Sequence, residues 1–216
     1  MELATELLEK PLMSNLSRGL WGYHGHTPGG RELTVQSTGI GGPSAAVVLS
    51  ELAGLGVRRA IRVGSCLALD PELEPGDAIV LEAALAGDGV GSALAPGAPP
   101  LEADRALTAT LAADSERTRA ALVASTDLYY DDRTFRRREW RAAGAAAVEL
   151  SAAALLAVGK RRGVAIACAL VVAESATGER LEDEVLDAAL LELGGRAAGA
   201  LATAPQSSVA DDASLA

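Results

Sequence analysis

Apolar residues gather in five short runs along the chain, and each run has the length and composition of a β-strand. The runs are rich in Val, Ile, Leu and Ala, and they cover residues 32–38, 60–64, 78–84, 120–126 and 164–172. The last run, V-A-I-A-C-A-L-V-V, is apolar without interruption. This pattern is typical of a central strand that is covered on both faces of its sheet.

Segments rich in Ala and Leu separate these runs and predict helices. The predicted helices cover residues 43–54, 103–113, 149–162 and 184–201. The third ends in Lys160, Arg161 and Arg162, followed by Gly163. Cations in the last turn and a glycine just beyond it form a coherent stop signal for a helix. Strands that alternate with helices predict an α/β fold.

Composition narrows the class of protein. The chain has 216 residues, is 49% hydrophobic and carries a formal net charge of −10. Because nucleic-acid binding requires a basic face, we expect no nucleic-acid partner. Cys66 and Cys168 lie in apolar runs, which favours reduced core thiols in a cytoplasmic protein. The chain does not open like a signal peptide, and no charge-free apolar run is long enough to span a bilayer, so we expect no membrane association.

The length and the composition also predict the domain organisation. We expect a single domain over residues 1–204, because a chain of this length can bury one full hydrophobic core. Residues 86–101 are rich in Gly and Pro and predict a loop, whereas residues 205–216 are expected to form a disordered tail.

A glycine-rich turn links the first predicted strand to the first predicted helix, in S-T-G-I-G-G-P-S. Gly39, Gly41 and Gly42 remove the Cβ atoms that would keep a ligand away from the backbone. Pro43 suits the start of a helix, where a missing N–H costs little. A helix that starts there offers free N–H groups to an anion or a sugar oxygen. The alternative is an ordinary tight connection between a strand and a helix.

An arginine interrupts the second apolar run, in A-I-R-V-G-S-C. A charge within an apolar strand is costly unless it is paired or lies at an open end. Arg62 is therefore either an edge-strand residue that faces water or a group held for a bidentate contact with an anion. Ser65 follows the predicted strand and adds a hydroxyl and a backbone N–H.

Small or ionisable residues follow the ends of four predicted strands: Gly39, Ser65, Asp127 and Glu174. Ligands of open α/β sheets bind outside the carboxyl ends of the strands, so these residues predict a site. Asp127 could equally cap a helix or a turn. Glu174 could be a partly desolvated acid that carries a proton, or a solvated loop residue.

Five motifs, in order, resemble those of the nucleoside phosphorylases of the purine/uridine phosphorylase type. They are L-S-R-G-L-W-G-Y-H-G-H, S-T-G-I-G-G-P-S, I-R-V-G-S-C, A-S-T-D-L-Y-Y and A-V-E-L-S-A-A-A. The resemblance covers most of the chain. It implies a three-layer α/β/α fold with a central mixed, mostly parallel sheet.

The resemblance also implies roles for individual residues. Arg62 and Ser65 would hold phosphate, with Arg18 reaching the site of a neighbouring subunit. Glu174 lines up with the aspartate that protonates the leaving purine. The nucleoside would lie against Ile40, Tyr129, Val148, Glu149, Leu150 and Ser151. No metal and no cofactor is implied, and phosphate is the co-substrate.

The chain departs from the family pattern at several positions of the site. It opens on M-E-L-A-T-E-L-L-E-K-P and has no G-D-P-x-R loop, which supplies phosphate contacts in the family. Ser151 stands in place of the glutamate that binds the ribose hydroxyls, and Leu67 replaces a glycine beside the base. Glu174 is one methylene longer than the family aspartate.

These features together predict a nucleoside phosphorylase-like pentosyltransferase that acts on a purine or pyrimidine nucleoside in the cytoplasm, in nucleotide salvage. The departures keep two alternatives open, a nucleoside hydrolase and a non-catalytic homologue that binds nucleosides. Since Arg18 matters only if a second subunit presents it, we expect at least a homodimer. The resemblance extends this expectation to a trimer of dimers.

Overall fold

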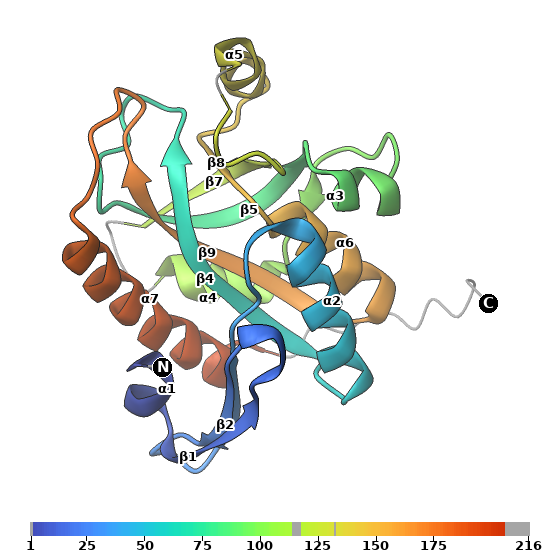
Figure 1. Ribbon diagram of the computed structural model, residues 1–216, viewed down its shortest axis with the longest axis vertical. Coiled ribbons are helices and arrows are strands. Elements are labelled where there is room, and N and C mark those ends of the chain that lie inside the picture. The colour runs from blue at the N-terminus through green and yellow to red at the C-terminus, as the bar shows by residue number, and fades with distance from the viewer. Residues whose placement is uncertain (1, 114–117, 132, 206–216) are drawn as a thin grey trace.

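A six-stranded mixed sheet forms the centre of the molecule (Figure 1). The computed structural model describes residues 2–113, 118–131 and 133–205. The strands of the sheet are β4 (Arg59–Ala68), β5 (Ala78–Ala86), β6 (Leu101–Glu102), β7 (Thr118–Ser125), β8 (Ala147–Glu149) and β9 (Ala165–Glu174). Their order is β6-β5-β7-β8-β4-β9.

The sheet closes on itself. β9 pairs in parallel with β4 on one side and antiparallel with β5 on the other, where Ala78 lies opposite Val171. β5 pairs in parallel with β7, which in turn pairs in parallel with β8. The predicted α/β class and the mixed sheet are therefore confirmed. The predicted three-layer arrangement is not confirmed, because the ring of strands is barrel-like.

Helices cover the strands on opposite sides, and Figure 1 shows α7 across the sheet from α2 and α6. The helices are α1 (Glu2–Leu7), α2 (Gly41–Gly54), α3 (Gly89–Leu94), α4 (Arg105–Ala113), α5 (Thr134–Ala142), α6 (Ala152–Arg162) and α7 (Asp183–Thr203), with the 3₁₀ helix η1 (Ser17–Gly19). Alternate side chains of β9 pack on opposite faces of the sheet. Leu170 packs toward α2 and α6, whereas Val171 packs toward α4 and α7. This explains the uninterrupted apolar run.

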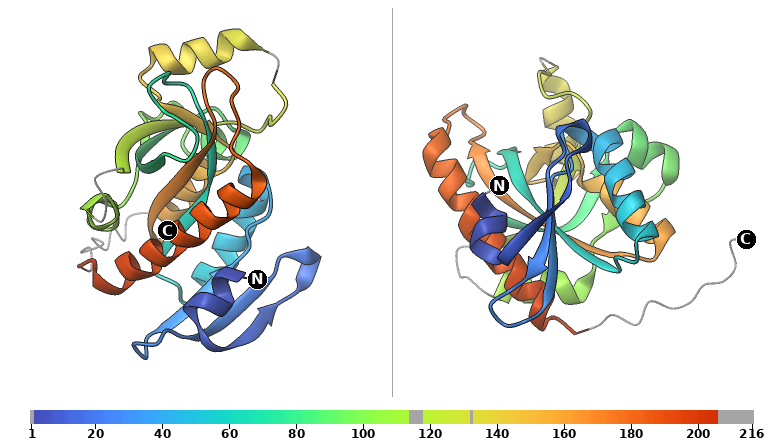
Figure 2. Two further views of the ribbon diagram at one scale, coloured as in Figure 1. Left: turned by 90° about the vertical axis from the view of Figure 1, so that its left-hand side faces the viewer. Right: turned by 60° about the horizontal axis from the view of Figure 1, so that its bottom comes forward.

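A second, three-stranded antiparallel sheet lies at the opposite end of the molecule from α5 (Figures 1 and 2). Its strands are β1 (Glu9–Asn15), β2 (Gly22–His26) and β3 (Glu32–Gln36). Its own buried cluster is small and consists of Ala4, Leu8 and Tyr23. The sequence predicted β3 alone of these strands.

The predicted strands and helices are all present, with ends that shift by a few residues. The stop signal of α6 is confirmed, because Gly163 adopts the left-handed conformation (φ 64°). The interval 86–101 is not only a loop, since it contains α3 and leads into β6. The helix predicted to start at residue 149 begins at Ala152, and Glu149 ends β8.

None of the described helices combines the length and the apolarity that a membrane span requires. The predicted disordered tail, residues 205–216, lies outside the described residues except for Pro205. The single domain over residues 1–204 stays a prediction.

Candidate active site

The pairing of β4 with β9 gathers most of the predicted phosphate and acid residues. Ser65 lies opposite Val171, and Leu67 lies opposite Glu174. Ser65 was expected to follow the strand, but β4 continues to Ala68, so Ser65 lies within it and is exposed. The strand is longer because β4 stays paired with β9 as far as Leu67 and pairs with β8 at Leu67 and Ala68, contacts that no local sequence pattern indicates.

Arg62 does not face water. It lies opposite Cys168 of β9, β8 pairs with β4 farther along at Leu67 and Ala68, and only 17% of the Arg62 side chain is exposed. Its Nε donates to Ser151 Oγ at 2.8 Å, and its Nη2 lies 3.2 Å from Glu149 Oε2. Nη1 is buried without a hydrogen-bond partner and lies against Gly64, where a Cβ would collide with it. The guanidinium is therefore held toward the start of α6.

Glu149 is the centre of this buried polar network. Its side chain is fully buried, and its two oxygens accept from the backbone N–H groups of Ala152 and Ser151, each at 2.8 Å. Ser125 Oγ donates to Glu149 Oε1 at 2.5 Å. The carboxylate thus caps α6 and neutralises Arg62, which satisfies the charge that burial would otherwise penalise.

This network corrects one inference about the sugar side of the site. On the predicted helix over residues 149–162, Glu149 and Ser151 would point to different faces, because they are two residues apart. The helix begins after both residues, and both side chains reach Arg62. The Glu149 carboxylate is occupied by protein donors, and its predicted contact with a nucleoside stays a prediction.

Sequence reasoning missed Ser125, although it follows the apolar run A-A-L-V-A directly. Its hydroxyl is fully buried, and it also accepts from the backbone N–H of Ala153 at 2.9 Å. Ser125 therefore joins the end of β7 to the start of α6. A polar residue at the end of an apolar strand was the available signal.

Asp88 is a second buried carboxyl that sequence reasoning missed. It is 1% exposed and caps α3 by accepting from Gly91 N–H at 2.8 Å, while its other oxygen has no hydrogen-bond partner. Burial raises the pKa of Asp88, and the negative charges of Asp127 and Glu149 add to this rise. A Cβ on Gly42 would lie 3.0 Å from the Asp88 carboxylate, so the start of α2 packs closely on it.

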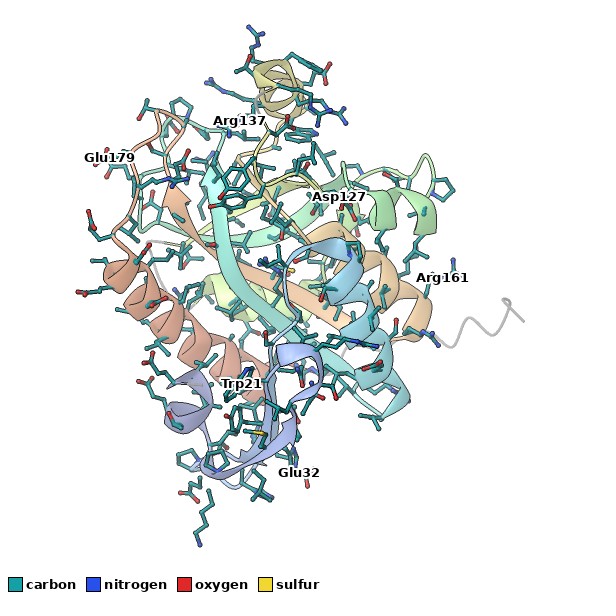
Figure 3. The ribbon with its side chains drawn as sticks, in the orientation of Figure 1. Trp21, Glu32, Asp127, Arg137, Arg161 and Glu179 are labelled. Atoms are coloured by element: carbon teal, nitrogen blue, oxygen red, sulfur yellow. The ribbon has the colours of Figure 1, made fainter. Side chains whose placement is uncertain are left out.

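Asp127 contacts the start of α3, and its role in the site stays a prediction. Its Oδ2 accepts from Gly89 N–H at 2.7 Å and thereby ties the residue after β7 to the start of α3. Figure 3 shows Asp127 beside α3. The glycine-rich turn also behaves as its sequence predicts, because Gly39 and Gly41 have φ values of 70° and 83°.

Glu174 is the last residue of β9 and is not a solvated loop residue. Its side chain is 17% exposed, and Arg180 Nε donates to Glu174 Oε2 at 2.6 Å. The hydrogen bond to Glu174 and the charge of Glu174 raise the pKa of the Arg180 guanidinium, and Tyr129 adds to this rise. Arg180, from the loop after β9, therefore holds the predicted acid in place.

A groove of about 540 Å³ adjoins this pair. It lies between the segments 71–75 and 175–185, and Pro71, Pro75, Ser175, Thr177 and Arg180 are among its lining residues. The groove does not reach Arg62. Among the described residues, no three His, Cys, Asp or Glu side chains form a group that could hold a metal ion.

The remaining predicted contacts differ in exposure. Ile40 and Tyr129 are 85% and 61% exposed, so a ligand could cover both. Leu150 is half-buried, whereas Val148 is buried against Leu69, Ala124 and Trp140. Arg18 is exposed in η1 with φ 58°, far from Arg62 in sequence and on the small sheet's side of the molecule. The roles of these residues stay predictions.

Comparison with known proteins identifies the class of protein that this fold and this site represent. The family model of the phosphorylase superfamily matches residues 2–204, and the chain belongs to this superfamily. The chain is 31% identical to the uridine phosphorylase of Salmonella typhimurium over 182 residues, which are 76% of this chain and 72% of that protein. It is 30% identical to a purine nucleoside phosphorylase of Caldanaerobacter subterraneus over 190 residues, 84% of this chain and 81% of that protein.

A further relative is matched over a shorter part. The guanosine phosphorylase of Halorubrum lacusprofundi is 32% identical over 139 residues, which are 62% of this chain and 58% of that protein. Among solved structures, the uridine phosphorylase of Vibrio fischeri complexed with 6-hydroxy-1-naphthoic acid is similar with a TM-score of 0.85. That match has 25% identity and covers 93% of this chain and 86% of the other.

Proposed function

We propose that this protein is a nucleoside phosphorylase, a pentosyltransferase that uses phosphate to cleave the N-glycosidic bond of a purine or pyrimidine nucleoside. The superfamily match spans residues 2–204, and similar proteins include uridine, guanosine and purine nucleoside phosphorylases. These relatives share one reaction, which supports the reaction class, but they act on different bases, so the base that this protein recognises is not assigned.

The pairing of β4 with β9 is the observation that carries the proposal. It brings Arg62 and Ser65, on one strand, next to the strand that ends in Glu174. Phosphorolysis brings an anion to one side of the glycosidic bond, and an acid can assist the leaving base on the other. Two neighbouring strands that run in parallel place Ser65 and Glu174 toward the same end of the sheet, and Arg62 lies three residues before Ser65.

The chemistry follows from these groups. Phosphate, held by Ser65, Arg62 and Arg18 of the partner subunit, attacks C1′ of the sugar as the bond from C1′ to the base nitrogen breaks. The sugar becomes cationic in the transition state, so the phosphate oxygens stabilise it electrostatically. Glu174 donates a proton to the leaving base, and Arg180 orients the carboxyl through the 2.6 Å hydrogen bond.

The engagement of Arg62 by Glu149 implies weak phosphate binding. Part of its charge is already neutralised within the chain by the Glu149 carboxylate. We expect millimolar affinity, at most about −4 kcal/mol. Calorimetry with phosphate should show this affinity and its loss in Arg62→Ala. Micromolar binding that Arg62→Ala leaves unchanged would contradict the role given to Arg62.

The ion pair between Arg62 and Glu149, together with Ser151, favours a second candidate, a nucleoside hydrolase that uses water in place of phosphate. A non-catalytic nucleoside-binding protein is the remaining alternative. A panel of purine and pyrimidine nucleosides, assayed with and without phosphate, separates the three. Release of base only with phosphate supports the phosphorylase, and release without phosphate supports the hydrolase. Binding without turnover supports the non-catalytic protein.

The protein is further proposed to form at least a homodimer, with a trimer of dimers as the larger assembly. Exposed apolar side chains near Arg18 support this, namely Leu12, Met13, Leu16 and Trp21. Large apolar side chains that are exposed close together in the chain favour a surface that a partner covers. A mass of one chain by light scattering would contradict the homodimer and remove Arg18 from the site. We further propose a cytoplasmic salvage role that needs no cofactor beyond phosphate as co-substrate.

A further inference from the structure

Both histidines of the 216-residue chain lie on the same strand, in the segment G-Y-H-G-H of β2. Successive side chains of a strand point to opposite faces, and Tyr23 and Gly25 are buried. A Cβ on Gly25 would lie 3.3 Å from the Leu8 side chain, so the inner face of this strand is closely packed. His24 and His26 therefore both face outward.

The two imidazole rings are close enough to share one ion. Their centroids lie 6.5 Å apart, and the ring planes are inclined by 61°. Two imidazoles that bind one metal ion at about 2.0–2.1 Å have centroids about 5–6 Å apart. His26 is exposed, so its ring can rotate toward His24.

A hydrogen bond already orients one of the rings. His24 Nδ1 lies 3.1 Å from Thr34 Oγ1 on the neighbouring strand. This bond leaves Nε2 of His24 available to an external ligand. A partner on the second ring nitrogen is how proteins usually fix a metal-binding imidazole.

Carboxylates flank the pair on both sides. His26 lies opposite Glu32 on β3 and opposite Glu9 on β1, and paired residues of adjacent strands share a face of the sheet. Both glutamates are exposed, and Figure 3 shows Glu32 at the small sheet's end of the molecule. Because the described residues hold no preassembled group of three ligands, the imidazole pair is the fixed part of this arrangement.

We propose that His24 and His26 form a chelating site for a divalent transition metal such as Zn²⁺, Ni²⁺ or Cu²⁺, completed by Glu32 or Glu9 and water. Imidazole is a preferred ligand of these ions. The site is separate from the proposed active site and departs from the expectation that the chain holds no metal. A bound ion would stabilise the small sheet, whose buried cluster has only three members, and the neighbouring η1 that carries Arg18.

The test is a calorimetric titration of the untagged full chain with Ni²⁺ and with Zn²⁺. One ion should bind per chain, and His24→Ala and His26→Ala should each weaken binding by at least about tenfold. Glu32→Ala should weaken it less, and Glu179→Ala, a matched exposed glutamate in the groove, should leave it unchanged. The double variant His24→Ala/His26→Ala contains no histidine, so it measures binding by all other groups.

A second measurement needs no variant. The chain has two histidines, so its proton NMR spectrum has two imidazole Cε1–H signals. Substoichiometric Zn²⁺ should shift or broaden both signals together. Response of one signal alone, response of neither, or equal affinity of the wild-type protein and the double variant would each overturn the proposal.

Discussion

Replacing Glu149 by Gln is the sharpest perturbation that the network offers. The groups that contact the carboxylate donate to it: the backbone N–H groups of Ser151 and Ala152, the hydroxyls of Ser125 and Ser151, and the Arg62 guanidinium. An amide in place of the carboxylate has one oxygen and one NH₂ group. Whichever way it is placed, its NH₂ group faces at least one backbone N–H, and the negative charge opposite Arg62 is lost.

The expected cost follows from these contacts. Removing one partner of a buried ion pair costs about 3–5 kcal/mol, and an unmet hydrogen bond to a charged group costs about 1.5–3 kcal/mol. Since these effects overlap, we expect Glu149→Gln to lower the free energy of unfolding by about 3–5 kcal/mol. The melting temperature should fall by on the order of 10 °C in a chain of this size.

Urea unfolding followed by far-UV circular dichroism measures this loss, at one protein concentration because assembly also contributes to stability. Glu182→Gln is the matched control, because Glu182 is exposed and its replacement should change stability by less than about 0.5 kcal/mol. A loss below about 1 kcal/mol in Glu149→Gln would refute the reasoning, since the carboxylate would then not be the group that holds Arg62 and α6.

Three further outcomes are expected. Ser151→Glu should favour ribonucleosides over 2′-deoxyribonucleosides by roughly 1–3 kcal/mol in kcat/KM. The reason is that a carboxylate accepts from both ribose hydroxyls, whereas the Ser151 hydroxyl is engaged by Arg62. An unchanged preference would contradict this role. Asp88→Asn should gain stability relative to the wild type as pH rises from about 4 to 7, measured by denaturant titration at each pH. The raised pKa means that the folded chain holds the Asp88 proton to a higher pH than the unfolded chain, whose pKa is about 3.9, so the stability of the wild type falls as pH rises above about 4. A pH-independent difference would show that Asp88 is ionised as usual. Cys66 and Cys168 should not react with a thiol reagent at pH 8 until the chain unfolds, because burial raises both thiol pKa values, that of Cys168 to about 12. Rapid labelling of the folded protein would contradict their burial.

The strands and helices that the sequence predicted are those with strong local signals. β9 is apolar throughout because it packs on both faces, and α6 ends at a glycine that adopts the left-handed conformation. Such features depend on a few neighbouring residues, and the hydrophobic pattern records them. The superfamily motifs then placed the chain in its class.

The features that were missed depend on distant parts of the chain. β8 has three residues and is a strand only because β4 and β7 flank it. α5 is rich in arginine and is anchored by the burial of Trp140, and the closure of the sheet rests on pairing between β5 and β9. None of these follows from local propensity.

The candidate site shows the same division. Arg62 was recognisable as a charge within an apolar run, and Glu174 as a charge at the end of one. Both are held in specific contacts. Ser125 and Glu149 are 24 residues apart, and Arg180 follows Glu174 in a loop with no regular pattern. Which donor meets which acceptor is decided by the fold, so the partners could not be paired from the sequence.

The central claim, that phosphate is the nucleophile, is tested most directly by ³¹P NMR. The protein is incubated with inorganic phosphate and the nucleoside that releases base fastest in the panel. The account predicts a new phosphate ester signal from a pentose 1-phosphate, equal in amount to the base released and much weaker in Glu174→Gln. Release of base with free sugar and no new phosphorus signal would contradict it.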